Sequence, residues 1–198
     1  MNVRETMMAK RTSWMISFAV AVAGLEGVVV PSAMTGGAVA AGGCEASVGS
    51  VWLPARQRPH RAEAFSNGPN CQKAIVVITV RGPDGSAQWV DAMKASDLMT
   101  FVDVKTTSAM KAALNEWIAQ GGPFKTAADL PPWPPGAEHP VNGEFPFYPE
   151  QGVDRDYYEK ARALRAPLFC YVQGMESMSC VALIEGGMVK LGVQSFPG

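Results

Sequence analysis

The chain has 198 residues, of which 47% are hydrophobic and 18% are charged, and its formal net charge is −1. The 17 basic and 18 acidic residues are scattered, without a long run of like charges, which excludes the basic surface typical of nucleic-acid-binding proteins. The length suits one domain with a sizeable hydrophobic core.

The first 40 residues have the pattern of a secretory signal peptide. A basic start precedes the uncharged run WMISFAVAVAGL (14–25), and small residues follow it. Basic, then apolar, then small is the order of export signals. Ala38-Val39-Ala40 supplies an A-x-A cleavage signature, so we expect a signal peptide over residues 1–40 and a single mature domain over residues 41–198.

Two alternatives for the N-terminal segment stay open. A retained membrane anchor needs about 20 apolar residues, and Glu26 interrupts the run after about a dozen. A lipoprotein would use Gly42-Gly43-Cys44, although Ala41 stands where such sites usually carry leucine. We therefore predict a periplasmic or secreted protein, with membrane attachment only if the segment is retained or Cys44 is lipidated.

All four cysteines follow the predicted cleavage point, and an even count in an oxidising compartment predicts disulfide bonds. Of the three pairings that four cysteines allow, we favour the local one, Cys44–Cys71 with Cys170–Cys180. A zinc site is the alternative, but no C-x-x-C spacing occurs, so neither a metal nor a cofactor is predicted.

The first half of the domain reads as strands followed by a helix. Residues 41–72 are expected to be irregular. Strands are predicted over Ala74–Arg81, which is β-branched and apolar on both faces, and then over 88–93 and 99–105. Apolar residues at positions 110, 113, 114, 117 and 118 form one stripe of a helix over 108–120, with Thr107 or Ser108 as its cap.

Residues 123–152 contain eight of the 15 prolines and are expected to form a long extended loop that wraps over the core. A second helix follows, capped by Asp154 and ending at Arg165, with an apolar stripe of Tyr157, Ala161 and Leu164. The C-terminus reads as three strands over 168–173, 178–184 and 188–193. A turn centred on Met175 would place Cys170 opposite Cys180.

These elements predict an α+β fold: an antiparallel sheet of about five to six strands, as one sheet or two packed sheets, with two helices and the proline-rich loop. No internal repeat and no common catalytic motif is present. His139 and Glu144 could form an acid–base pair. The acidic residues of 138–156 could bind calcium, and Arg56, Arg58, His60 and Arg61 could bind an anion, but solvated loops explain both groups more simply.

The sequence therefore favours an exported, non-catalytic protein that binds an envelope protein or a cell-wall component. Its predicted binding residues are the aromatic side chains of the proline-rich loop, Trp133, Phe145, Phe147 and Tyr148. A small periplasmic hydrolase that uses His139 and Glu144 is one alternative. A structural or assembly subunit of the cell envelope is another.

Overall fold

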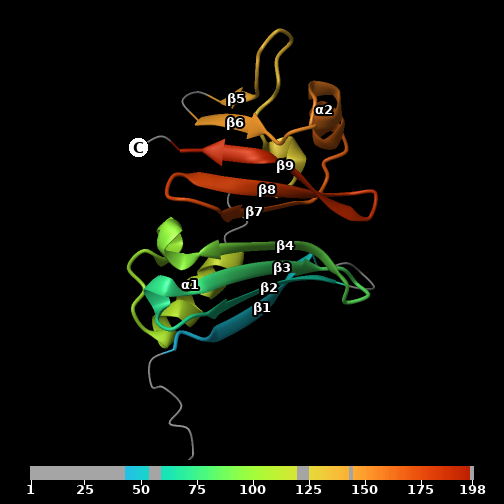
Figure 1. Cartoon of the computed structure of the whole chain (residues 1–198). Coiled ribbons are helices and arrows are strands. Elements are labelled where there is room, and N and C mark those ends of the chain that lie inside the picture. The colour runs from blue at the N-terminus through green and yellow to red at the C-terminus, as the bar shows by residue number, and fades with distance from the viewer. Residues whose placement is uncertain (1–42, 54–58, 120–124, 143–144, 197–198) are drawn as a thin grey trace, which may run out of the picture. The chain divides into compact units, whose positions relative to one another are not determined.

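Two antiparallel sheets form the framework of the protein. The computed structural model describes residues 43–53, 59–119, 125–142 and 145–196 (Figure 1). The strand order is β1-β2-β3-β4 in the first sheet and β5-β6-β9-β8-β7 in the second, and all neighbouring strands are antiparallel. The strands are β1 Ala46–Leu53, β2 His60–Asn67, β3 Ile75–Arg81, β4 Ala87–Lys94, β5 Val141–Asn142, β6 Phe145–Pro149, β7 Leu168–Val172, β8 Ser177–Ile184 and β9 Gly187–Ser195.

The α+β class is confirmed, with two helices, α1 (Thr107–Ala119) and α2 (Arg155–Ala163). The two sheets together contain more strands than predicted, because β1, β2, β5 and β6 lie where loops were expected. None of the helices in the described part of the chain is long and apolar enough to cross a membrane. The predicted signal peptide lies outside the described residues.

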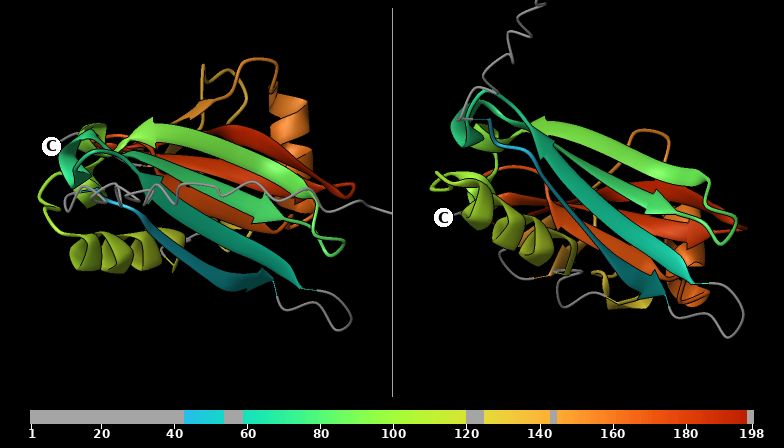
Figure 2. Two further views of the ribbon diagram at one scale, coloured as in Figure 1. Left: turned by 60° about the horizontal axis from the view of Figure 1, so that its bottom comes forward. Right: turned by 90° about the horizontal axis from the view of Figure 1, so that it is seen from below.

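Helix α1 and strands β7 and β8 share one hydrophobic core with the inner face of the first sheet. The predicted stripe of α1 is confirmed, since its five apolar residues are all buried. Trp117 is fully buried, and its indole Nε1 donates a hydrogen bond to the carbonyl oxygen of Val172 at the end of β7 (2.8 Å). The helix lies beside β1 in both views of Figure 2. Its cap is Thr106, whose Oγ1 accepts from the backbone of Ala109, rather than Thr107 or Ser108.

Residues 41–72 were predicted to be irregular, but they contain β1 and β2. The pattern was hidden by composition: the inward positions of β2 carry small or polar residues, among them Ala62 and Ala64, whereas Phe65 points outward and is exposed. Strand β3 was predicted to be buried on both faces, but its outer face, the open face of the sheet, is only partly covered: Thr79 is buried there, Val77 is half-buried and Ile75 is exposed. Residues 61, 63 and 65 of β2 lie on the same open face.

The strand predicted over 99–105 is wrong. Met99–Phe101 is a single 3-10 turn that returns the chain from β4 towards α1. Its only buried side chain is Phe101, whose ring packs edge to face against Trp117 at 5.3 Å. Phe101 therefore anchors this turn in the first core, whereas Met99 is exposed.

Part of the predicted proline-rich loop is sheet, because β5 and β6 lie within residues 123–152. Proline lacks an N–H and is tolerated near sheet edges, and β6 has on one side only the two-residue strand β5. On its other side β6 pairs with β9 at Gly192. That glycine has φ 154°, and a side chain there would collide with the backbone of Tyr148 and the ring of Phe147. The close approach of β6 to β9 thus depends on it.

The second hydrophobic core lies on the other face of the second sheet, under α2. Asp154 caps α2 as predicted, its side chain accepting a hydrogen bond from the backbone of Tyr157. The predicted stripe is wrong in part: Tyr158 and Ala161 are the buried residues, whereas Leu164 follows the helix as its C-cap and is exposed. Because the helix ends at Ala163, Leu164 does not continue the helical face that packs on the sheet.

Two disulfide bonds join Cys44 to Cys71 and Cys170 to Cys180, which is the predicted pairing. Cys170 and Cys180 are direct partners in the register of β7 and β8, and both are fully buried in the second core. The other bond fixes the start of β1, where the N–H of Cys44 also donates to the carbonyl oxygen of Gly68. No described cysteine is free.

Candidate functional site

Helix α2 fixes the start of the proline-rich segment through backbone groups. Trp133 is held on both sides: its N–H donates to Glu159 Oε1 at 2.7 Å, and its carbonyl accepts from Arg155 Nε at 2.9 Å. The hydroxyl of Tyr158 donates to the carbonyl oxygen of Pro131 at 2.8 Å. Because prolines supply no N–H, this segment cannot form its own ladder, and side chains of α2 satisfy its backbone instead.

The negative charge of Glu159 contributes to this attachment, because its carboxylate accepts the hydrogen bond from the Trp133 N–H. Partial burial by itself raises the pKa of the Glu159 carboxyl, but the hydrogen bond from the backbone of Trp133 and the neighbouring guanidinium of Arg162 outweigh it. The net effect lowers the pKa below its ordinary value. Arg162 Nη1 lies 2.7 Å from Glu159 Oε2, and its Nε donates to the carbonyl oxygen of Leu130.

The four predicted binding aromatics do not form one surface. Phe147 is fully buried, with its ring 5.5 Å from that of Tyr158 in the second core. Trp133 is half-buried, and its indole Nε1 donates to the carbonyl oxygen of Ala137. Phe145 and Tyr148 are exposed. Phe147 and Trp133 therefore contribute to packing in this fold, and the two exposed rings are the ones available to a partner.

Of the predicted acid–base pair, His139 and Glu144, the structure describes only the histidine. The ring of His139 lies against that of Tyr148, with centroids 5.2 Å apart. Glu144 lies outside the described residues. Among the residues that are described, no carboxylate is hydrogen-bonded to His139.

The structure describes only part of the predicted charged clusters. Arg56 and Arg58 lie outside the described residues, and His60 is a buried residue of β2 whose ring contacts Trp52. Of the acidic residues, Glu150 pairs with Lys190 at 2.8 Å, and that hydrogen bond lowers its pKa. Within the described ranges, no group of three or more His, Cys, Asp or Glu side chains could hold a metal ion.

An apolar groove of about 560 Å³ opens at the hairpin between β7 and β8. We call it the methionine groove. Its lining is apolar apart from one carboxylate and one hydroxyl; the residues are Met99, Val172, Met175, Glu176, Ser177, Met178 and Phe196.

Three parts of the chain build this groove. The backbone N–H of Met99 donates to the carbonyl oxygen of Gly174 in the hairpin turn, which brings the 3-10 turn beside it. The N–H of Phe196 donates to the carbonyl oxygen of Glu176, which holds the end of β9 against the same turn.

The methionine groove extends to one of the predicted binding residues. The ring of Phe145 lies 5.7 Å from the ring of Phe196, and both are exposed. The side chain of Gln194, which is buried, donates to the carbonyl oxygens of Phe145 and Pro146 and so fixes β6 next to this end of β9. Phe145 therefore forms an apolar extension of the groove.

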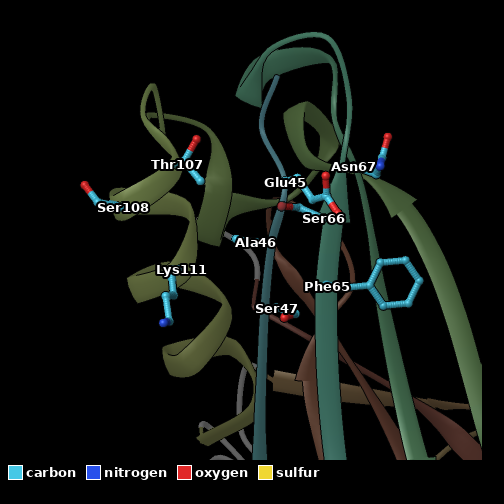
Figure 3. Close-up of a pocket in the computed structure, with 9 residues that line it drawn as sticks. All are labelled: Glu45, Ala46, Ser47, Phe65, Ser66, Asn67, Thr107, Ser108 and Lys111. Carbon is cyan, nitrogen blue, oxygen red and sulfur yellow. The ribbon is translucent and has the colours of Figure 1, made fainter. Parts of the chain in front are cut away.

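A larger hollow, of about 930 Å³, lies between the start of α1 and the strands β1 and β2 (Figure 3). Seven of its nine lining residues are polar or charged, among them Glu45, Thr107 and Lys111. In Figure 3 the ring of Phe65 projects from β2 on the side away from α1, and Lys111 points along the helix. The polar groups of this hollow thus do not converge on one point, as the groups of a selective binding site would.

A hydrogen-bonded chain also joins the two sheets. Trp89 Nε1 donates to the hydroxyl of Tyr171 at 3.0 Å, and that hydroxyl donates to Asp91 Oδ2 at 2.8 Å. Burial raises the pKa of Tyr171, so its proton stays on the phenol at ordinary pH. We read this chain as a link between β4 and β7.

The described residues form a disulfide-bonded α+β protein with an apolar groove at one end of its second sheet. Comparison with protein-family models, with curated proteins and with solved structures finds no match to this chain. Function is therefore inferred from the residues of the chain alone.

The sequence prediction missed Met99, Met175 and Phe196. A signal for one of them existed, because Met175 sits in the tip of a predicted hairpin, where polar or glycine residues are usual. Met99 was assigned to a strand, and Phe196 lies beyond the last predicted strand, which ended at residue 193. Only the folded sheet brings the three together.

Proposed function

We propose that this protein is an exported, non-catalytic binding protein that takes an apolar segment of a partner protein into the methionine groove. The observation that carries this proposal is the composition of the groove: seven residues line it, five are apolar, and one, Glu176, is ionisable. Its volume of about 560 Å³ lies in the range of small ligand sites. Methionine side chains are flexible and polarisable, which suits them to varied apolar partners.

The two disulfide bonds fit an extracellular or secreted protein. They also bear on the form of attachment. Cys44 is 1% exposed, and its sulfur is bonded to that of Cys71. A sulfur in a disulfide has no free valence for the thioether of a lipoprotein. This supports a protein released after cleavage of the predicted signal peptide.

The chemistry of the groove favours a protein partner over a cell-wall glycan. A glycan would need several hydrogen-bonding side chains to replace the water around its hydroxyl groups, and the lining offers Glu176 and Ser177 alone. Apolar side chains need no such replacement. The single carboxylate favours a partner segment that carries lysine or arginine beside its apolar residues.

Three labelled peptides of equal length test this proposal by fluorescence anisotropy. One has leucines on both sides of a lysine, the second replaces the lysine with glutamate, and the third replaces the leucines with serine. The proposal expects saturable binding in the order lysine peptide, glutamate peptide, serine peptide. Equal binding of all three, or none, would contradict it.

Two variants tie the binding to the groove. Phe196→Ser and Met175→Ser each remove apolar lining and should weaken the lysine peptide by roughly tenfold. Val90→Ser is the matched control, because Val90 is 56% exposed on β4 and does not line the groove. Point substitutions are preferable to deletion of 131–149, since that deletion would remove β6 and the buried ring of Phe147.

A further inference from the structure

The methionines of the described residues differ sharply in exposure. There are six, at positions 93, 99, 110, 175, 178 and 188. Met99 is 63% exposed and Met175 is 49% exposed, whereas Met110 and Met178 are buried at 0% and 6%. Positions 93 and 188 are intermediate. The two exposed methionines thus both line the methionine groove, and no other described methionine is exposed.

Exposed thioethers are the ones that oxidants reach. Hydrogen peroxide transfers one oxygen atom to the sulfur, which becomes a sulfoxide, while the peroxide is reduced to water. The S–O bond forms as the O–O bond breaks, and the thioether is oxidised by two electrons. The product is polar and chiral, and it accepts hydrogen bonds strongly, so it favours water over an apolar neighbour.

We propose that Met99 and Met175 are an oxidation-sensitive pair that controls binding at the methionine groove. This inference rests on the proposed function of the groove and adds its regulation. The two side chains come from separate elements, the 3-10 turn and the β7–β8 hairpin, and a backbone hydrogen bond from the Met99 N–H to the Gly174 carbonyl holds these elements together. Oxidation therefore changes two walls of one groove.

The change is confined to the groove because the fold beneath it does not use these two side chains. Neither Met99 nor Met175 belongs to a hydrophobic core, whereas Met178 packs in the second core and Met110 in the first. Sulfoxide at the exposed positions therefore leaves the cores intact. A reductase that uses a thiol reductant to convert methionine sulfoxide back to the thioether would restore the apolar lining.

The experiment treats the disulfide-intact protein with dilute hydrogen peroxide and follows each methionine by peptide mass spectrometry. Met99 and Met175 should oxidise on the order of tenfold faster than Met110 and Met178. The affinity for Nile red, a neutral apolar dye, and for the lysine peptide should fall about tenfold as these two sulfurs are oxidised. Circular dichroism and thermal unfolding should stay unchanged over the same period.

The double variant Met99→Leu/Met175→Leu is the matched control, since leucine keeps the groove apolar and is not oxidised. It should bind the dye before and after peroxide treatment, and methionine sulfoxide reductase with dithiothreitol should restore binding to the oxidised wild type. Wild type that is oxidised at both positions and still binds fully would overturn the switch alone. Similar oxidation rates for all the described methionines would also overturn it. Untreated wild type that binds neither probe would overturn the proposed function, and the switch with it.

Discussion

Two apolar regions of the second sheet differ in whether other parts of the chain cover them. At one end α2 and the proline-rich segment cover the sheet, and Phe147, Tyr158 and Leu168 are fully or almost fully buried. At the other end the same sheet lies open as the methionine groove, where Phe196 is exposed. Both ends are apolar, so hydrophobicity by itself does not tell a core from a candidate binding surface.

The two regions differ in which groups form hydrogen bonds with the backbone of the segment that lies on the sheet. At the covered end, side chains of α2 bind the carbonyl groups of Leu130, Pro131 and Trp133, so a segment without enough N–H groups can lie on the sheet. At the open end the carbonyl groups of Gly174 and Glu176 in the hairpin turn already accept hydrogen bonds from the N–H groups of Met99 and Phe196. Polar attachment thus decides which part of an apolar face is covered.

The largest effect is expected from Tyr158, the centre of the covered end. Tyr158→Ala removes a fully buried ring and the hydrogen bond to Pro131, and should lower the free energy of unfolding by about 3–5 kcal/mol. Phe145→Ala, at the open end, should cost less than about 1 kcal/mol. Urea unfolding measures both. Equal losses would mean that the two ends are equally part of the core.

The disulfide bond under the covered end comes next. Cys170→Ala/Cys180→Ala should lower the free energy of unfolding by about 2–4 kcal/mol, because the bond restricts the unfolded chain and its sulfurs fill buried space. The comparison is with Val90→Ser, an exposed change on the first sheet. A double variant as stable as wild type would show that β7 and β8 are held by packing and ladder hydrogen bonds alone.

Glu159 gives a smaller and pH-dependent effect. Its pKa is lower in the folded protein than its ordinary value of 4.5, so the folded state binds fewer protons and is stabilised above that pH. This stabilisation is lost as the pH falls through the folded pKa. Glu159→Gln should therefore cost about 1 kcal/mol at pH 7 and almost nothing at pH 2.

Thermal unfolding between pH 2 and pH 7 measures the difference between wild type and Glu159→Gln. Glu138→Gln, an exposed carboxylate in the same segment, is the control and should follow wild type. A difference between wild type and Glu159→Gln that stays constant from pH 7 to pH 2 would show that the charge of Glu159 has no part in the attachment of Trp133.

The smallest effect on stability is expected at the open end. Phe196→Ser should change the free energy of unfolding by less than about 1 kcal/mol while it weakens binding of the lysine peptide. Calorimetry and anisotropy on the same preparation separate the two quantities. A large loss of stability would assign Phe196 to the core and remove the contrast between the ends.

Helix α1, the last three strands and the Cys170–Cys180 bond could be read from the sequence, because each depends on local spacing. The apolar stripe of α1 repeats along one helix, and Cys170 and Cys180 lie at matching distances from one turn. Strand β2 could not be read in this way, since its inward residues are alanine, serine and histidine and its aromatic residue points outward. Its position depends on pairing with β1 and β3.

The candidate site divides in the same way. All four aromatic residues were selected from composition as one binding set, but Phe147 is buried in the second core, whereas Phe145 and Tyr148 are exposed. Alternation places Phe147 and Tyr148 on opposite faces of β6, and Phe145, on the same face as Phe147, lies at the start of the strand and is not covered. Composition could not supply that distinction without the strand.

By itself, the sequence determined the α+β class and the two helices, because local periodicity and turn chemistry act over a few residues, and it favoured the disulfide pairing that the structure confirms. The tertiary structure alone decided that Met99, Met175 and Phe196 would line one groove and that the proline-rich segment would be fixed by α2. These contacts join residues far apart in the chain. They form only once β9 has paired with β8 and the carbonyl groups of the hairpin turn accept hydrogen bonds from Met99 and Phe196.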